Sequence, residues 1–97
     1  PDLNLGTASG ASCAPQVQAR LEAVLGRQAG YDWVANGRFK GGHITRHYGD
    51  PANGIDAVQL ELSQRTYMDE ASLAYDEVAA TRLQPLLGAM LEAALAA

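Results

Sequence analysis

The stretch GIDAVQLELSQ, residues 54 to 64, carries the clearest secondary-structure signal in the chain. Apolar and polar residues alternate in it, in the order Val58, Gln59, Leu60, Glu61, Leu62 and Ser63. Successive side chains of a strand point to opposite faces, so this alternation predicts a strand with one apolar and one polar face. The apolar face has to pack against another layer, and the rest of the fold is predicted around this strand.

Two elements are predicted before this strand. The charge-poor opening PDLNLG, residues 1 to 6, is typical of an interior strand of a sheet. In APQVQARLEAVLG, residues 14 to 26, one face of a helix is outlined by Val17, Leu21, Val24 and Leu25. Pro15 suits the first turn of that helix, and Gly26 or Gly30 is a natural end for it.

Two further segments complete the predicted architecture. YDWVANG, residues 31 to 37, favours an extended conformation. Residues 75 to 96 follow a long helical pattern with an apolar seam at Leu83, Leu87, Met90, Leu91 and Ala94. Pro85 is expected either to kink this helix or to open a second one, because proline lacks a backbone donor. The order strand, helix, strand, strand, helix predicts a layered α/β fold.

Length, charge and cysteine content limit the class of protein. The 97 residues fit one domain over 1–97, and the net charge of -4 argues against nucleic acid as a partner. The sequence lacks a run of eighteen apolar residues and a secretory pattern at its start, so neither a membrane span nor export is expected. The single cysteine, Cys13, fits a reducing cytoplasm and is expected to be buried and inert.

The most cationic segment is NGRFKGGHITRHYG, residues 36 to 49. Arg46 offers a planar fork of donors that matches a carboxylate through two parallel hydrogen bonds, which suits a site for an acidic small molecule. The alternative is a surface arginine paired with Asp50 or Asp56. The glycines of this segment are expected to form turns, because the sequence that defines a phosphate-binding loop is absent.

His43 and His47 invite comparison with the helical histidine pair of zinc proteases, but the glutamate of that motif is missing. Gly41-Gly42 and the β-branched Ile44 and Thr45 favour an extended chain. The two imidazoles would then lie roughly 13 Å apart, too far for one metal ion. In this reading Ile44, Arg46 and Tyr48 share one face, and His43, Thr45 and His47 share the other.

Glu61 is the candidate proton-transfer residue. It lies on the polar face of the predicted strand, near its C-terminal end, where open α/β sheets place ligand clefts. A carboxylate held there could take a proton from water and return it to a leaving amine. The alternative is a solvated glutamate or one paired with Arg65.

The segments NGRFKGGHITRHYG, AVQLELSQRTYMDE and PDLNLGTASGASC resemble the N-formylglutamate amidohydrolase family. The resemblance covers nearly the whole chain. It is most specific over residues 36 to 70, and for the terminal helix it is only general. It implies that residues 1–97 form the C-terminal portion of one longer amidohydrolase domain, whose missing N-terminal segment is the partner of this chain. The implied fold is a mixed-sheet, zinc-carboxypeptidase-like (phosphorylase/hydrolase-like) layered fold.

The resemblance also implies an activity, namely metal-dependent hydrolysis of N-formyl-L-glutamate to formate and L-glutamate in histidine degradation. Zinc is the implied cofactor, with its ligands upstream of Pro1 and no metal ligand within this chain. Glu61 would be the general base and acid. Arg46 would bind a substrate carboxylate, with Arg38, His47 and Asn36 as supporting contacts.

Two other readings stay open. In one, the Arg46 cluster belongs to a non-catalytic module that binds an acidic metabolite. In the other, the chain is a structural piece whose apolar faces need the upstream segment. The 97 residues alone are expected to show no deformylase activity, because the metal site that the resemblance implies is incomplete in them.

Overall fold

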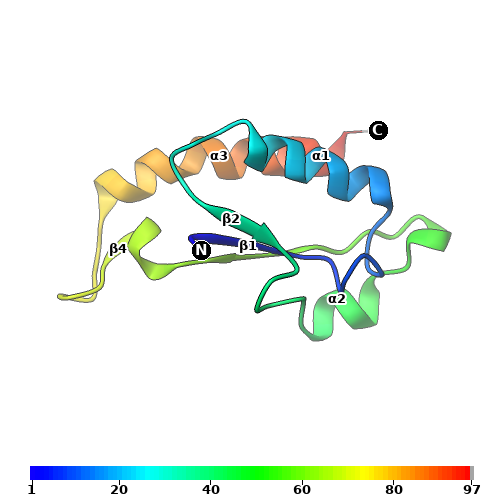
Figure 1. Ribbon diagram of the computed structural model, residues 1–97. Coiled ribbons are helices and arrows are strands. Elements are labelled where there is room, and N and C mark those ends of the chain that lie inside the picture. The colour runs from blue at the N-terminus through cyan, green and yellow to red at the C-terminus, as the bar shows by residue number, and fades with distance from the viewer. Residues whose placement is uncertain (97) are drawn as a thin grey trace.

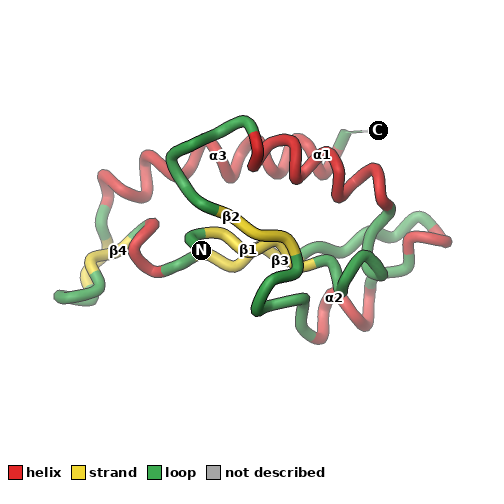
Figure 2. Tube along the Cα trace, in the orientation of Figure 1, coloured by secondary structure: helices red, strands yellow, loops and turns green. Residues whose placement is uncertain are grey.

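In the computed structural model, which describes residues 1–96, three strands form a mixed sheet in the order β2–β1–β3. The central strand β1 (Leu3–Gly6) pairs in parallel with β2 (Trp33–Ala35) and antiparallel with β3 (Gln59–Leu62). Figure 2 shows the three strands side by side. The predicted mixed α/β class is confirmed.

Two long helices cover one face of this sheet (Figure 1). They are α1 (Pro15–Gly26) and α3 (Glu77–Leu95), which pack against each other. The Asp76 side chain caps α3 by accepting a hydrogen bond from the Ala79 backbone N–H at 3.0 Å. No helix within residues 1–96 has the length and apolar character that crossing a membrane requires.

Shorter elements complete the chain. A six-residue helix, α2 (His43–Tyr48), lies on the side of the sheet away from α1 and α3. Two 3₁₀ turns, η1 (Pro51–Asn53) and η2 (Gln64–Thr66), flank β3. A small hairpin of β4 (Met68–Asp69) and β5 (Ala74–Tyr75) leads into α3.

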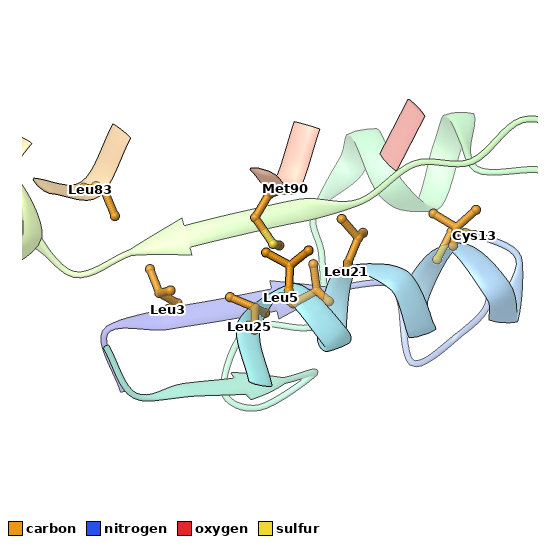
Figure 3. Packing of buried hydrophobic residues seen from close by; sticks show 9 residues of the cluster. Leu3, Leu5, Cys13, Leu21, Leu25, Leu83 and Met90 are labelled. Atoms are coloured by element: carbon orange, nitrogen blue, oxygen red, sulfur yellow. The ribbon is translucent and has the colours of Figure 1, made fainter. Parts of the chain in front are cut away.

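The apolar core lies between the sheet and the two long helices (Figure 3). Leu3 and Leu5 of β1 are fully buried. They pack in one cluster with buried side chains of the helices and the preceding loop, namely Cys13, Val17, Leu21, Val24, Leu25, Leu83 and Met90. Each fully buried aliphatic side chain contributes about 1.5–3 kcal/mol. One face of the sheet therefore packs against this cluster, and the opposite face does not take part in the core.

Several predicted elements are confirmed. The opening strand, the 14–26 helix, the extended 31–37 segment and the 58–62 strand all form, and the four predicted apolar residues of α1 are its buried ones. Pro85 lies inside one continuous α3, so of the two expected alternatives, a kink or a second helix, the second helix is excluded. Leu91 is 66% exposed, so its place in the predicted seam is wrong as well.

The prediction of an extended chain at residues 43–48 is wrong, because this segment is the helix α2. The assignment of its side chains to two alternating faces is wrong with it. Thr45 is buried, and its hydroxyl donates to the Gly42 carbonyl at 2.9 Å. Burial of this one side chain and contacts from distant residues outweigh the weak helix propensity of the segment.

The rule that places ligand clefts at the C-terminal ends of strands does not apply to Glu61, although Glu61 does lie near the C-terminal end of its strand. Strand β3 runs antiparallel to β1, so its C-terminal end lies at the N-terminal end of β1, where Leu62 pairs with Leu3. The rule about strand ends applies to parallel strands. The position of Glu61 follows instead from the face of the sheet to which its side chain belongs.

Cys13 is buried, as predicted. Burial and the neighbouring Asp56 carboxylate raise the pKa of its thiol. The unfolded chain therefore ionises this thiol at lower pH than the folded one, and the contribution of Cys13 to stability is lost as pH rises above about 8.5. We expect Cys13 in the folded protein to react with iodoacetamide at about pH 8 far more slowly than in urea. Peptide mapping by mass spectrometry measures both rates, and equal rates would contradict the burial.

Candidate functional site

The face of the sheet opposite the core carries polar side chains. Asn4 of β1 pairs in register with Glu61 of β3, and Gln59 precedes Glu61 by two residues on the same face. These positions alternate with Leu3, Leu5 and Leu60, which belong to the core cluster or pack against it. The period of two along each strand therefore places Glu61 on the polar face, as predicted.

A hollow of about 420 Å³ opens beside Glu61, and we call it the Glu61 hollow. Its lining includes the polar residues Glu61, Asn4 and Arg38 and the aromatic residue Phe39. The volume falls within the range of about 300–1,000 Å³ that is common for small-molecule sites. Glu61 itself is half-buried, so its carboxylate is both held by the fold and accessible from the hollow.

A second hollow of about 360 Å³, the cationic hollow, adjoins the first. Its lining includes the three cations Arg38, Lys40 and Arg46, together with Gln59 and the Gly41–Gly42 backbone. Arg38 lines both hollows. The Glu61 carboxylate and two guanidinium groups are thus gathered along one connected surface, which suits an anionic ligand.

The predicted ion-pair alternatives are not formed in the described part of the chain. Asp56 accepts the Ala14 backbone N–H at 2.7 Å and Asp50 accepts the Asn53 amide at 2.8 Å, while the salt bridge of residues 1–96 joins Arg65 to Asp2. Arg46 therefore has no carboxylate partner among these residues. Its guanidinium donates to the Gly41 carbonyl at 3.1 Å, which fixes the side chain without neutralising it.

Arg65 is directed away from Glu61 by a cluster at the start of β1. Its guanidinium lies 2.6 Å from the buried carboxylate of Asp2, which also accepts the Ser63 hydroxyl at 3.1 Å. The Asp2 backbone N–H donates to the Asp32 carboxylate at 2.6 Å, and this bond lowers the pKa of Asp32. Glu61 therefore forms no ion pair with Arg65, although Arg65 is the arginine nearest to it in the sequence.

Sequence reasoning missed Gln59. Its side-chain oxygen accepts the Gly42 backbone N–H at 2.9 Å, and its side-chain NH₂ donates to the Glu61 carboxylate. Gln59 thereby connects the start of α2 to the candidate base. The available signal was its position two residues before Glu61, which puts both side chains on one face of the strand.

Asn36 is bound to the loop that follows β1. Its backbone adopts a left-handed conformation with φ 51°. Its side-chain oxygen accepts the N–H groups of Thr7 at 2.9 Å and Ser9 at 3.1 Å, and its NH₂ donates to the Thr7 hydroxyl at 2.8 Å. The side chain thus connects the 36–42 loop to the turn after β1, and its predicted contact with substrate stays a prediction.

His43 and His47 lie on the exposed side of α2, with ring centroids 4.8 Å apart and nearly parallel planes. The predicted separation of the two rings is wrong because it assumed an extended chain. His47 also meets the Tyr48 ring edge-on at 4.7 Å. Within residues 1–96, no three His, Cys, Asp or Glu side chains come together as a metal-binding group. The described residues therefore do not fit a zinc site by themselves.

The fold and the site together define an α/β protein with a candidate site for an acidic small molecule. A family model described as N-formylglutamate amidohydrolase matches residues 1–68. The chain belongs to this N-formylglutamate amidohydrolase family.

Named relatives agree with this assignment. The chain is 57% identical over 97 residues to the N-formylglutamate deformylases of Pseudomonas putida and Pseudomonas aeruginosa, covering 99% of this chain and 36% of each relative. A crystal structure of N-formylglutamate amidohydrolase from Ralstonia eutropha JMP134 superposes with a TM-score of 0.80 at 30% identity, covering 96% of this chain and 33% of that one. The chain thus spans about a third of the length of these proteins.

Proposed function

We propose that the full-length protein carrying this chain hydrolyses N-formyl-L-glutamate to formate and L-glutamate. The observation that carries the proposal is the placement of the half-buried Glu61 carboxylate beside Arg38 and Arg46 in two adjoining hollows. One group can transfer a proton, while the guanidinium groups can bind the carboxylates that distinguish this substrate. Relatives named N-formylglutamate deformylase support the same reaction.

In the proposed reaction, the oxygen of a water molecule forms a bond to the formyl carbon, and Glu61 accepts a proton from that water. The carbon–nitrogen bond then breaks, its electron pair stays on nitrogen, and Glu61 returns the proton to that nitrogen. The products are formate and L-glutamate, whose amino group takes up the proton that formic acid releases. Glu61 ends in its starting ionisation state, so one carboxylate serves both steps.

Zinc remains the proposed cofactor, with ligands from sequence outside residues 1–97, and it would supply Lewis-acid polarisation of the formyl carbonyl. The described residues do not form a zinc ligand set among themselves, and their proposed part in the reaction is proton transfer and carboxylate binding. A zinc-carboxypeptidase-like layering, a role in histidine degradation and a cytoplasmic location are proposed along with the activity. The mixed sheet flanked by helices supports the first of these.

Substrate carboxylates are proposed to bind at Arg46 and Arg38. Both guanidinium groups line the cationic hollow, and the Gly41 carbonyl orients that of Arg46. His47 and Asn36 are retained as weaker candidate contacts. The Asn36 amide already makes three hydrogen bonds within the protein, and His47 stacks on His43.

The direct test measures formate release by the purified full-length protein with N-formyl-L-glutamate, and with N-formyl-L-norleucine as a substrate lacking the side-chain carboxylate. We expect turnover of the first and little of the second, because the norleucine side chain has no carboxylate to pair with Arg46 or Arg38. Tight binding of L-glutamate without formate release would instead support the non-catalytic binding module. A chelator that abolishes formate release, with recovery on adding zinc, would support the cofactor.

Replacing Arg46 with alanine is expected to raise KM for N-formyl-L-glutamate by about 10- to 100-fold with a smaller change in kcat, because a charge-assisted pair to the substrate is lost. Arg46→Lys keeps the charge but not the planar fork and should recover only part of the affinity. Steady-state kinetics on both variants measures the effect. An unchanged KM in Arg46→Ala would remove this residue from the substrate site.

A further inference from the structure

We propose that Gln59 is the positioning residue of the candidate base, holding the Glu61 carboxylate in place and connecting it to the helix that carries Arg46. This inference rests on the proposed role of Glu61 in hydrolysis. It goes further by assigning a function to a residue that neither the family resemblance nor the sequence motifs single out.

The orientation of the Gln59 amide is fixed by its partners. The Gly42 backbone N–H can only donate, and it lies 2.9 Å from the Gln59 side-chain oxygen. The other end of the amide must therefore be the NH₂ group. This group is directed at the Glu61 carboxylate, which can only accept while it is ionised. Both hydrogen bonds are satisfied in one arrangement, and flipping the amide would break both.

This arrangement restricts the Glu61 side chain. Glu61 and Gln59 extend from the same face of β3; the half-buried Gln59 lines the cationic hollow, and Glu61 lines the Glu61 hollow. A donor to one carboxylate oxygen leaves the other oxygen free to accept a proton from water. Small errors in the position of a catalytic group lower rates strongly, about 10²-fold for 1 Å. The bond from Gln59 therefore has a direct consequence for proton transfer.

The same amide connects the two functions of the site. Gly42 precedes the first residue of α2, and the Gly41 carbonyl next to it accepts the Arg46 guanidinium at 3.1 Å. Gln59 thus fixes the start of α2 relative to β3. The charged groups around the Gln59–Glu61 pair are Arg38, Lys40 and Arg46, with Asp2 on the β1 side of the Glu61 hollow.

Two substitutions separate positioning of Glu61 from simple support of α2. Gln59→Met removes both hydrogen bonds at similar size. Gln59→Glu keeps an acceptor for the Gly42 N–H but, when ionised, has no donor for Glu61. We expect kcat for N-formyl-L-glutamate to fall about 10- to 100-fold in both variants at about pH 8. If Gln59 only supported α2, the Gln59→Glu variant would keep the kcat of the wild-type protein.

The pH dependence of Gln59→Glu gives a second readout. Two adjacent carboxylates share a proton at low pH, and a protonated Glu at position 59 regains a donor. The ratio of its kcat to that of the wild-type protein should therefore rise as pH falls from about 8 to about 5.5, whereas the ratio for Gln59→Met should stay flat. Gln16→Glu on the exposed surface of α1 adds the same charge far from the site and serves as the matched control.

The kinetics of these variants test the positioning role of Gln59 separately from the role of Glu61. Glu61→Gln is measured in the same series with formate release as the assay. If Glu61→Gln loses activity while Gln59→Met and Gln59→Glu keep it, the positioning role is wrong and the role of Glu61 stands. A pH-independent kcat ratio for Gln59→Glu also overturns the positioning role. If Glu61→Gln retains wild-type kcat, both proposals fail together.

Discussion

Replacing Glu61 with glutamine is expected to lower kcat for N-formyl-L-glutamate hydrolysis by about 10²- to 10⁴-fold with little change in KM. Glutamine has nearly the same shape but cannot accept a proton from water or return it to the leaving nitrogen. Its side-chain oxygen can still accept the hydrogen bond from Gln59, so the surrounding geometry should survive. Steady-state formate release by the full-length protein measures the effect.

The matched control is Glu92→Gln, an identical chemical change on the exposed surface of α3. It should leave kcat, KM and the melting temperature unchanged. Circular dichroism and metal analysis of Glu61→Gln should match the wild-type protein, which separates lost chemistry from lost structure. Wild-type kcat in Glu61→Gln would remove this carboxylate from the mechanism, even though the family assignment would stand.

The face on which Glu61 lies could be predicted from the sequence because the signal is local. Alternation with period two specifies which side chains share a face of a strand, and Val58, Leu60 and Leu62 pack against the core as that pattern requires. The buried face of α1 was predictable for the same reason, since its four apolar residues repeat at helical spacing. Local patterns of this kind predict which residues of β3 and α1 face the core.

The helix α2 could not be predicted because its stabilisation is non-local. Two glycines and two β-branched residues disfavour helix in this segment when only neighbours in sequence are considered. The Gly42 N–H is bound by Gln59 on β3, and Thr45 is buried, and neither contact is visible in sequence spacing. The error had a consequence for the site, because it separated His43 from His47 and misplaced the face that carries Arg46.

The ion pairs could not be predicted from sequence spacing either. Arg65 follows Glu61 closely in the chain, yet it pairs with Asp2 because β1 and β3 are antiparallel neighbours. Likewise, Asp50 and Asp56 follow Arg46 closely but are engaged by Asn53 and by the Ala14 backbone. Which charges remain free for a ligand is a property of the folded chain, and it is this property that strengthens the proposal for Arg46.

Replacing Gly41 with alanine is expected to have the second largest effect, because it should both destabilise the protein and disrupt substrate binding. Gly41 has φ +125°, a conformation that residues with a side chain rarely adopt, and an added Cβ would lie 2.3 Å from the Thr45 hydroxyl oxygen. Thr45 is buried and β-branched, so it has little freedom to move. Strain and crowding together should lower the unfolding free energy by about 2 kcal/mol or more.

A change of backbone conformation at Gly41 should also displace groups of the candidate site. The Gly41 carbonyl orients Arg46, and the next residue, Gly42, is bound by Gln59. We therefore expect KM for N-formyl-L-glutamate to rise along with a lower melting temperature, measured by calorimetry and formate release. Gly88→Ala is the matched control with the opposite sign. Gly88 lies within α3, an added Cβ meets no atom within 4 Å, and alanine there should stabilise the helix by about 0.5–1 kcal/mol. If Gly41→Ala kept wild-type stability and KM, the 41–46 segment could not be the rigid support that holds Arg46 at the site.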